Sequence, residues 1–442
     1  MSRALPGTDS TGGRLRWATA VFILSLGAWW ALAVSRGRYA LPTSDLTVYR
    51  MAGLSLWHHP GALYHALFGF PAALPFTYTP FAALLFAVPA GLPLTVWQVV
   101  LTAAGIVSLP LALYFAAGMA GIRERAACAL ACAAVALWFE PVFMNFYFGQ
   151  INLILLLAVV ADLSAGTERR WRGALVGIAA AIKLTPLIFV VYLLATRQFR
   201  AAATALGVFA ATIVVGLVLL PGPSMTYWSG GFLGNTAVKI GALGRERVQN
   251  QSLNAIMVRA THDGPHALAF WLAASLLIVV IGITTAVFAA RRGQPLLGLL
   301  LTAATGLLIS PVSWTHHWVF AVLGLPLAVA ALRNGGLWAR VAVLAAALLI
   351  TVFTIWPTDL RAPQKLSGLL RLAPHAGGLE YRWSGLTLVL GNLYAVAALA
   401  FIAIAAAAVL PSRKNDQHPT RSPDLHETDS PAPAVRASRP GE

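Results

Sequence analysis

The sequence predicts an all-α integral membrane protein that crosses the bilayer many times. Of its 442 residues, 58% are hydrophobic and only 10% are charged, and the mean hydropathy is +0.74. A water-soluble domain carries about 25% charged residues, so most of this surface must contact lipid. Many of the apolar runs are also long enough to form membrane-spanning helices. These observations exclude soluble enzymes, nucleic-acid-binding proteins and disordered scaffolds.

The first element is an uncleaved membrane span. Arg14 and Arg16 precede an apolar run over residues 17–34, which is too long for the core of a signal peptide. We therefore expect residues 1–16 to form a short cytoplasmic arm. Further spans are expected at residues 76–92, 95–118, 127–139, 149–165, 201–220, 268–290, 294–310, 318–332, 339–356 and 386–410.

One more apolar stretch, residues 173–196, is interrupted by Lys183 and Pro186 and predicts a re-entrant or broken helix. With it, the count is ten to twelve crossings between residues 17 and 410. Residues 411–442 are rich in proline, serine and charge and predict a disordered cytoplasmic tail. The polar segment after the first span predicts a loop that carries short helices.

Charge fixes the expected orientation. The chain has 31 basic and 15 acidic residues, and the basic ones gather in short loops, as is typical of the cytoplasmic side. Eight of the ten histidines then fall in loops on the opposite side, so any chemistry is expected there. Residues 76–118 must cross an odd number of times, which the two spans expected in that stretch do not satisfy.

Asp45 follows the first span and is a candidate general base, since a carboxylate at the membrane surface can accept a proton from a sugar hydroxyl. Capping of a helix over residues 46–57 is the alternative. Tyr78 lies in the proline-rich entry to the next span, where it either contacts a ligand or anchors the interface. Gln150 and Asn152 begin an apolar run and must face a cavity or another helix.

Lys183 lies midway along an apolar stretch, where a charge either meets an anionic group such as a lipid phosphate or extends to the interface.

A long polar loop contains Arg247, Asn250 and Gln251. The arginine is a candidate for phosphate and the two amides for sugar hydroxyls, although a solvated loop is equally consistent with this composition.

His316 and His317 lie in a tight turn between two apolar spans. Adjacent histidines point to different sides of a helix and seldom bind one metal. Without an HExxH or Asp-x-Asp pattern, no metal or other cofactor is expected. A phosphate leaving group is the better partner for these imidazoles.

Six short motifs, taken together and in order, resemble glycosyltransferase family 87. They are Asp45-Leu-Thr-Val-Tyr49, Leu74-Pro-Phe-Thr-Tyr-Thr-Pro-Phe81, Phe148-Gly-Gln-Ile-Asn152, Lys183-Leu-Thr-Pro186, Asn250-Gln-Ser252 and Ser313-Trp-Thr-His-His317. The resemblance extends over about residues 17–410. It implies a GT-C-like bundle of the kind found in membrane mannosyltransferases of actinobacterial envelopes.

The resemblance implies an inverting transfer of mannose from polyprenyl-phosphate-mannose to a lipid-linked mannoside. The acceptor is then of the phosphatidylinositol mannoside, lipomannan or lipoarabinomannan type. It also implies an α-1,2 linkage and an active site on the extracytoplasmic face of the plasma membrane. Asp45 is then the base. The donor phosphate is assigned to His316, His317, Lys183 and Arg247, and the sugar or acceptor to Tyr78, Gln150, Asn250 and Gln251.

A glycolipid transporter or flippase is the alternative function. Such proteins are commonly built from internal repeats with broken helices in corresponding positions. The two halves of this sequence show no convincing repeat, and Lys183 is the one ionisable residue that the sequence places at mid-membrane. The pattern therefore favours an enzyme.

Overall fold

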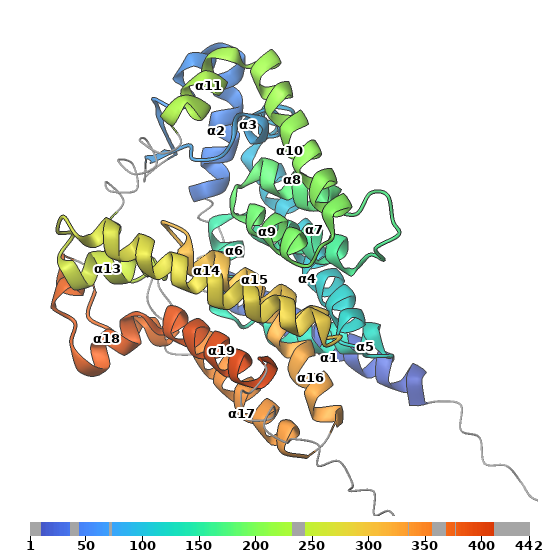
Figure 1. Ribbon diagram of the computed structural model, residues 1–442. Coiled ribbons are helices and arrows are strands. Elements are labelled where there is room, and N and C mark those ends of the chain that lie inside the picture. Colours follow the sequence, from blue (N-terminus) through green and yellow to red (C-terminus); the bar gives the residue numbers. More distant parts are fainter. Residues whose placement is uncertain are drawn as a thin grey trace, which may run out of the picture. The chain divides into compact units, whose positions relative to one another are not determined.

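The structure is a computed structural model that describes residues 10–35, 44–69, 73–231, 244–334, 336–355, 368–375 and 377–410. The expected tail, residues 411–442, and most of the expected N-terminal arm lie outside these ranges. The described residues up to Val409 form one compact unit. Its helices confirm the predicted all-α membrane architecture (Figure 1).

The described chain is almost entirely helical, with short 3-10 or π turns marked η. The first half contains α1 (Ser10–Ser35), α2 (Ser44–His58), η1 (Pro60–Ala62), α3 (Pro80–Ala87), α4 (Leu94–Met119), α5 (Arg125–Ala136), α6 (Glu140–Phe148), α7 (Asn152–Ser164), α8 (Ala174–Ile182), η2 (Thr185–Leu187), α9 (Ile188–Ala195), α10 (Phe199–Leu219), α11 (Pro221–Thr226) and η3 (Tyr227–Gly231). The second half contains α13 (Leu253–Thr261), α14 (Ala267–Arg291), α15 (Pro295–Ile309), η4 (Thr315–Leu323), α16 (Gly324–Asn334), α17 (Gly336–Phe353), η6 (Leu369–Leu372), η7 (Leu379–Arg382), α18 (Gly385–Gly391) and α19 (Leu393–Val409).

The loop after the first span carries short elements, as expected. α2 and η1 are followed by β1 (Leu67–Phe68) and β2 (Leu74–Pro75), which pair antiparallel with Phe68 opposite Leu74. α3 then begins in a well-capped way, because Thr79 accepts a hydrogen bond from the Ala82 amide and Pro80 occupies the first turn.

Four helical segments of the described chain are long and apolar enough to cross a membrane. They are Leu94–Met119, Phe199–Leu219, Ala267–Arg291 and Thr315–Arg333. The pair α18 and α19 makes a fifth if it is one span bent by 83°. Ten to twelve crossings were expected, but α5, α7 and α15 have 12, 13 and 15 residues. At about 1.5 Å per residue, such helices are shorter than a hydrocarbon core of roughly 30 Å.

The short α3 answers the question of how often residues 76–118 cross. An entire span was expected at residues 76–92, but α3 has only eight residues and α4 has 26. A helix of eight residues is about 12 Å long and does not span the hydrocarbon core. Of the two helices, α4 alone is long and apolar enough to cross, which agrees with the required odd number.

The predicted break in residues 173–196 is present. α8 ends at Ile182, and Lys183 has an extended backbone with φ −139° and ψ 127°. The chain resumes as η2, with Pro186 in its first turn, and continues into α9. Both α8 and α9 pack against α10 (Figure 1). The interruption leaves Lys183 between two half-helices.

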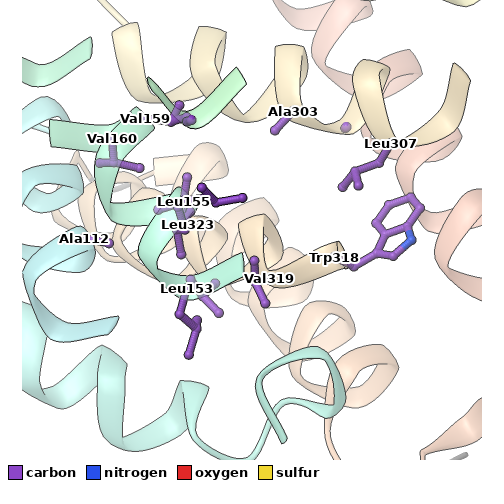
Figure 2. Close-up of a cluster of buried hydrophobic side chains, with 14 of the residues drawn as sticks. Ala112, Leu153, Leu155, Val159, Val160, Ala303, Leu307, Trp318, Val319 and Leu323 are labelled. Atoms are coloured by element: carbon purple, nitrogen blue, oxygen red, sulfur yellow. The ribbon is translucent and has the colours of Figure 1, made fainter. Parts of the chain in front are cut away.

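The core beneath the polar region joins four elements. Figure 2 shows side chains of α7, α15 and η4 gathered with Ala112 of α4. Leu153, Leu156 and Leu323 in this cluster are fully buried. Burial of one such side chain stabilises the fold by roughly 1.5–3 kcal/mol. This packing holds the beginnings of α7 and η4 against each other.

Candidate functional site

Asp45 lies in the first turn of α2, where the helix dipole favours a carboxylate. Its side chain also makes a contact outside its own helix, because Nε2 of Gln150 donates a hydrogen bond to Oδ2 of Asp45. The two residues are 105 positions apart in the chain. A role in helix initiation therefore does not account for all the contacts of Asp45, which also belongs to a tertiary polar cluster.

The turn between α6 and α7 brings Gln150 to Asp45. α6 ends at Gly149, which has left-handed backbone angles of φ 67° and ψ 47° that glycine adopts readily. A Cβ atom at this position would stand 2.7 Å from Cβ of Leu46, the residue after Asp45. Glycine thus allows α2 to lie directly on the turn.

Two tyrosines complete the contacts of Gln150. The hydroxyls of Tyr49 and Tyr78 share a hydrogen bond of 2.6 Å, and the one that accepts it donates its own proton to Oε1 of Gln150, which lies 3.0 Å from Tyr49 and 3.2 Å from Tyr78. Tyr49 is on the same face of α2 as Asp45, four residues further on. The two rings meet edge to face. The hydroxyls therefore hold the Gln150 amide from the side opposite Asp45.

Asn152 connects this group to Lys183. Nζ of Lys183 donates to Oδ1 of Asn152 at 2.9 Å, and Nδ2 of Asn152 faces Oε1 of Gln150 at 3.4 Å. The ammonium group also lies 5.9 Å from the centre of the Tyr78 ring. We name the six residues the Asp45 cluster; they are Asp45, Tyr49, Tyr78, Gln150, Asn152 and Lys183.

The helix break that positions Lys183 is stabilised locally. Backbone groups freed inside a membrane protein need partners, because hydrocarbon supplies none. The Thr79 hydroxyl, one residue after Tyr78, donates to the carbonyl of Ala181, two residues before Lys183. This bond ties the entry to α3 to the end of α8, so Tyr78 and Lys183 are held together.

The residues in the middle of the Asp45 cluster are more deeply buried than those at its ends. Gln150 and Asn152 are 7% and 5% exposed, whereas Asp45, Tyr78 and Lys183 are half-buried. A small cavity borders Gln150 and is lined by Leu46, Gln98, Leu101, Thr102, Asn145, Phe146 and Gly149. The side chains at the two ends of the cluster are therefore partly exposed, and the amides between them are enclosed.

His316 and His317 lie next to the lysine end of the cluster. Nδ2 of Asn152 donates to the His316 carbonyl at 3.0 Å, and the two imidazole rings stand 4.7 Å apart. Lys183 lies within electrostatic range of both rings. Nε2 of His316 is buried and has no hydrogen-bond partner among the described residues. Buried polar atoms are generally paired, so this nitrogen is suited to a ligand.

Asn250 and Gln251 form a second polar group, which bonds to the turn before His316. Asn250 donates to the Arg245 carbonyl and accepts from the Ser313 amide. Gln251 donates to the carbonyls of Val248 and Gly391 and accepts from the Tyr394 amide. Both side chains are 0% exposed. Their hydrogen-bonding groups serve the backbone, so we leave both residues out of the site.

Arg259 organises this second group. One of its terminal nitrogens donates to the carbonyls of Glu246, Arg247 and Asn250, and the other donates to Oδ1 of Asn392. The guanidinium group stacks over the Trp383 ring at 5.2 Å. Arg247 contributes its carbonyl here, while its side chain is exposed. We name Arg259, Asn250, Gln251 and Asn392 the Arg259 cluster.

Sequence reasoning did not assign Tyr49 or Asn152 to a site. Tyr49 follows Asp45 by four residues, which is the spacing of neighbours on one helix face. Asn152 follows Gln150 by two and begins α7. The helical spacing of the first pair could have indicated a shared face. The contact between Asn152 and Lys183 depends on the tertiary fold.

The arrangement combines a proton acceptor with a binding place for an anion. A carboxylate held by a hydrogen bond can accept a proton from a hydroxyl group. An ammonium group beside two imidazoles can hold a phosphate. These are the two requirements of a direct displacement of a phosphate by an alcohol.

A model of glycosyltransferase family 87 matches residues 76–311, more than half of the chain. The chain belongs to glycosyltransferase family 87. The match includes Tyr78, Gln150 and Lys183. Asp45 precedes the matched range and is linked to it by the Gln150 hydrogen bond.

Curated relatives come from mycobacteria. The chain is 37% identical over 332 residues to a polyprenol-phosphate-mannose-dependent alpha-(1-2)-phosphatidylinositol pentamannoside mannosyltransferase of Mycobacterium tuberculosis (strain CDC 1551 / Oshkosh), with 71% of this chain and 72% of the relative covered. It is 33% identical over 296 residues to a polyprenol-phosphate-mannose-dependent alpha-(1-2)-phosphatidylinositol mannoside mannosyltransferase of Mycobacterium tuberculosis (strain ATCC 25618 / H37Rv), with 62% and 67% covered. No solved structure matches the chain.

Proposed function

We propose that this family 87 member transfers mannose from polyprenyl-phosphate-mannose to a phosphatidylinositol mannoside and forms an α-1,2 linkage. The printed names of the mycobacterial relatives support this donor, this class of acceptor and this linkage. The catalytic domain would extend over residues 17–410. Lipomannan and lipoarabinomannan are acceptors of the same chemical kind and belong to the same proposal.

The observation that carries the proposal is the continuous hydrogen-bonded connection between a carboxylate and an ammonium group. It runs from Asp45 through Gln150 and Asn152 to Lys183. A glycosyl transfer from a lipid phosphate needs a base for the incoming hydroxyl and a positive group for the departing phosphate. The Asp45 cluster holds both within one packed unit.

In the proposed reaction, Asp45 accepts the proton of an acceptor hydroxyl group as its oxygen attacks C1 of the mannose. The bond between C1 and the phosphate oxygen breaks on the opposite side of the sugar ring, so a β-linked donor gives an α-linked product. The departing polyprenyl phosphate keeps the electron pair. Lys183 and His316 or His317 stabilise its negative charge.

The proposed location is the extracytoplasmic face of the plasma membrane. The pattern of basic loops in the sequence supports a position of the Asp45 loop and of the turn before η4 on that side. A lipid phosphate at headgroup depth would then meet Lys183 where α8 ends. The prenyl chain would stay in the bilayer while the sugar lies at the polar cluster.

Reconstituted vesicles test this function against the alternative of a glycolipid transporter or flippase. Purified protein is given polyprenyl-phosphate-mannose labelled in the sugar, together with a phosphatidylinositol mannoside, and the lipids are analysed by mass spectrometry. The expected result is an acceptor that is one hexose larger, with the label in a new α-1,2 bond. Movement of labelled lipid across the vesicle without a new glycosidic bond would contradict the proposal.

A further inference from the structure

The two amides between Asp45 and Lys183 have fixed orientations. Lys183 has only donors, so the oxygen of Asn152 must face it, which turns the Asn152 nitrogen toward Gln150. An ionised Asp45 has only acceptors, so the Gln150 nitrogen must face it and the Gln150 oxygen faces Asn152 and the tyrosines. Chemistry, and not a choice of side-chain flip, therefore sets the direction of every bond.

All of these bonds point the same way. Nζ of Lys183 donates to Asn152 at 2.9 Å, Asn152 donates to Gln150 at 3.4 Å, and Gln150 donates to Asp45. Successive hydrogen bonds in one direction polarise each other, and the effect grows where the local dielectric is low. Both connecting residues are more than nine-tenths buried, so water screens this chain weakly.

The surroundings hold the two amides in place. The second hydrogen of the Asn152 amide donates to the His316 carbonyl at 3.0 Å. The paired hydroxyls of Tyr49 and Tyr78 donate a hydrogen bond to the Gln150 oxygen. Neither amide can rotate without losing at least two hydrogen bonds. The position of the Asp45 carboxylate is thereby connected to the place proposed for the donor phosphate.

We propose that Gln150 and Asn152 are positioning residues that link the Lys183 ammonium group to Asp45 and hold the carboxylate in the orientation needed to accept a proton. This inference rests on the proposed function and changes the role of Gln150 from a sugar contact to a support for the base. Tyr49 and Tyr78 belong to the same support. Lys183 keeps two further donors for the phosphate.

Two substitutions of Gln150 give a test that a merely structural role would not pass. Gln150→Met removes the donor without adding charge, and kcat should fall about 10- to 100-fold with little change in KM for the acceptor. Gln150→Glu places two carboxyl groups together. Such a pair shares one proton, and the protonated Glu can donate to Asp45 as the amide does.

The ratio of Gln150→Glu to wild-type kcat is therefore expected to be highest at acidic pH and to fall as the pH rises and the shared proton is lost. Within the described part of the chain, Lys183, Tyr49 and Tyr78 interact electrostatically with Asp45, and they are unchanged in both proteins. Gln150→Met should show no such recovery at acidic pH. A ratio that does not depend on pH, or a wild-type kcat in Gln150→Met, would overturn the inference.

A double-mutant cycle tests the connection itself. Asn152→Leu should lower kcat in the same direction, and Gln150→Met combined with Asn152→Leu should be no slower than the slower single variant, because both changes interrupt one chain. Multiplied losses would show two independent effects and contradict the proposal.

The control is Gln198→Glu, a glutamine whose oxygen accepts from Arg172, where a carboxylate is well tolerated. It should keep the wild-type rate and pH profile. Failure of the wild-type enzyme to make any mannoside would refute the proposed function. If the wild-type enzyme transfers mannose and the Gln150 variants have the same kcat and pH profile, only the positioning role is refuted.

Discussion

The Asp45 cluster and the Arg259 cluster contain the same kinds of residue and serve different purposes. Each has buried amides, and each has one cation. In the Arg259 cluster the side chains bind mainly backbone carbonyls, and one guanidinium group serves three of them. In the Asp45 cluster the side chains bind one another, and the residues at its two ends, Asp45 and Lys183, are only half-buried.

This difference shows what distinguishes a ligand-binding site from a polar cluster that only stabilises the fold. Polar residues that satisfy the backbone hold loops in place and have no capacity left for a ligand. Polar residues that satisfy each other, and that carry charged groups at half-buried ends, are suited to a substrate. The density of polar residues in a sequence does not separate these cases, whereas the partner of each hydrogen bond does.

The largest effect is expected from Asp45→Asn. This change removes the proton acceptor and keeps the size of the side chain, so mannose transfer should fall by about 10²- to 10⁴-fold. Expression and elution as a folded monodisperse protein should match wild type. Asp263→Asn, which alters an exposed ion pair with Arg245, is the matched control and should retain full transfer. A fully active Asp45→Asn protein would remove Asp45 from the mechanism.

Arg259→Met should mainly affect stability. It leaves three backbone carbonyls and the Asn392 side chain without their donor, and each unsatisfied buried group costs about 1–3 kcal/mol. We expect a loss of at least about 3 kcal/mol, measured by denaturation in detergent. The transfer rate of the fraction that remains folded should equal that of wild type. A loss of kcat without a loss of stability would contradict a purely structural role for the Arg259 cluster.

Lys183→Met should mainly affect the donor. A hydrogen bond from a charged group contributes about 1.5–3 kcal/mol, so kcat/KM for polyprenyl-phosphate-mannose should fall about 10- to 100-fold. Steady-state kinetics with donor and acceptor varied separately would measure this. Arg247→Met is the comparison, because that side chain is exposed. Equal losses in both variants would mean that the phosphate site extends to the second cluster.

The smallest effect is expected from Tyr78→Phe. It deletes neutral hydrogen bonds to Tyr49 and Gln150, each of which contributes about 0.5–1.5 kcal/mol. The expected reduction in kcat is roughly three- to tenfold, read from initial rates. Tyr394→Phe deletes a hydroxyl that donates to Glu140 at 3.0 Å and should leave the rate of folded enzyme unchanged. The reverse ranking would argue against a site at Asp45.

The fold class and the break at Lys183 could be predicted from the sequence because both follow from local composition. An apolar run identifies a helix, and Lys183 with Pro186 interrupts one. The short α3 was missed, although Pro89 interrupts the apolar run over residues 76–92 and could have indicated that the helix ends near Ala87. Helix length in lipid depends on where backbone groups find partners.

Sequence reasoning named the two ends of the Asp45 cluster and Gln150, but it did not assign Asn152 or Tyr49. Asp45 and Lys183 attract notice because a carboxylate and an ammonium group are rare in such a sequence. Asn152 could not be assigned, because its partner Lys183 is 31 residues away and reaches it through a tertiary contact. Gln251 was assigned to the substrate for its polarity, but its amide is used by Val248, Gly391 and Tyr394.

The geometry of the Asp45 cluster depends on Gly149, a residue that has no side-chain functional group. The two halves of the site approach each other across a glycine that leaves no room for even a methyl group beside Leu46. An alanine there would act as a wedge, tilting the α2 segment away and opening the gap that Gln150 has to bridge. Loss of catalysis could therefore arise at a position where no chemistry takes place, through a displacement of less than the width of one atom.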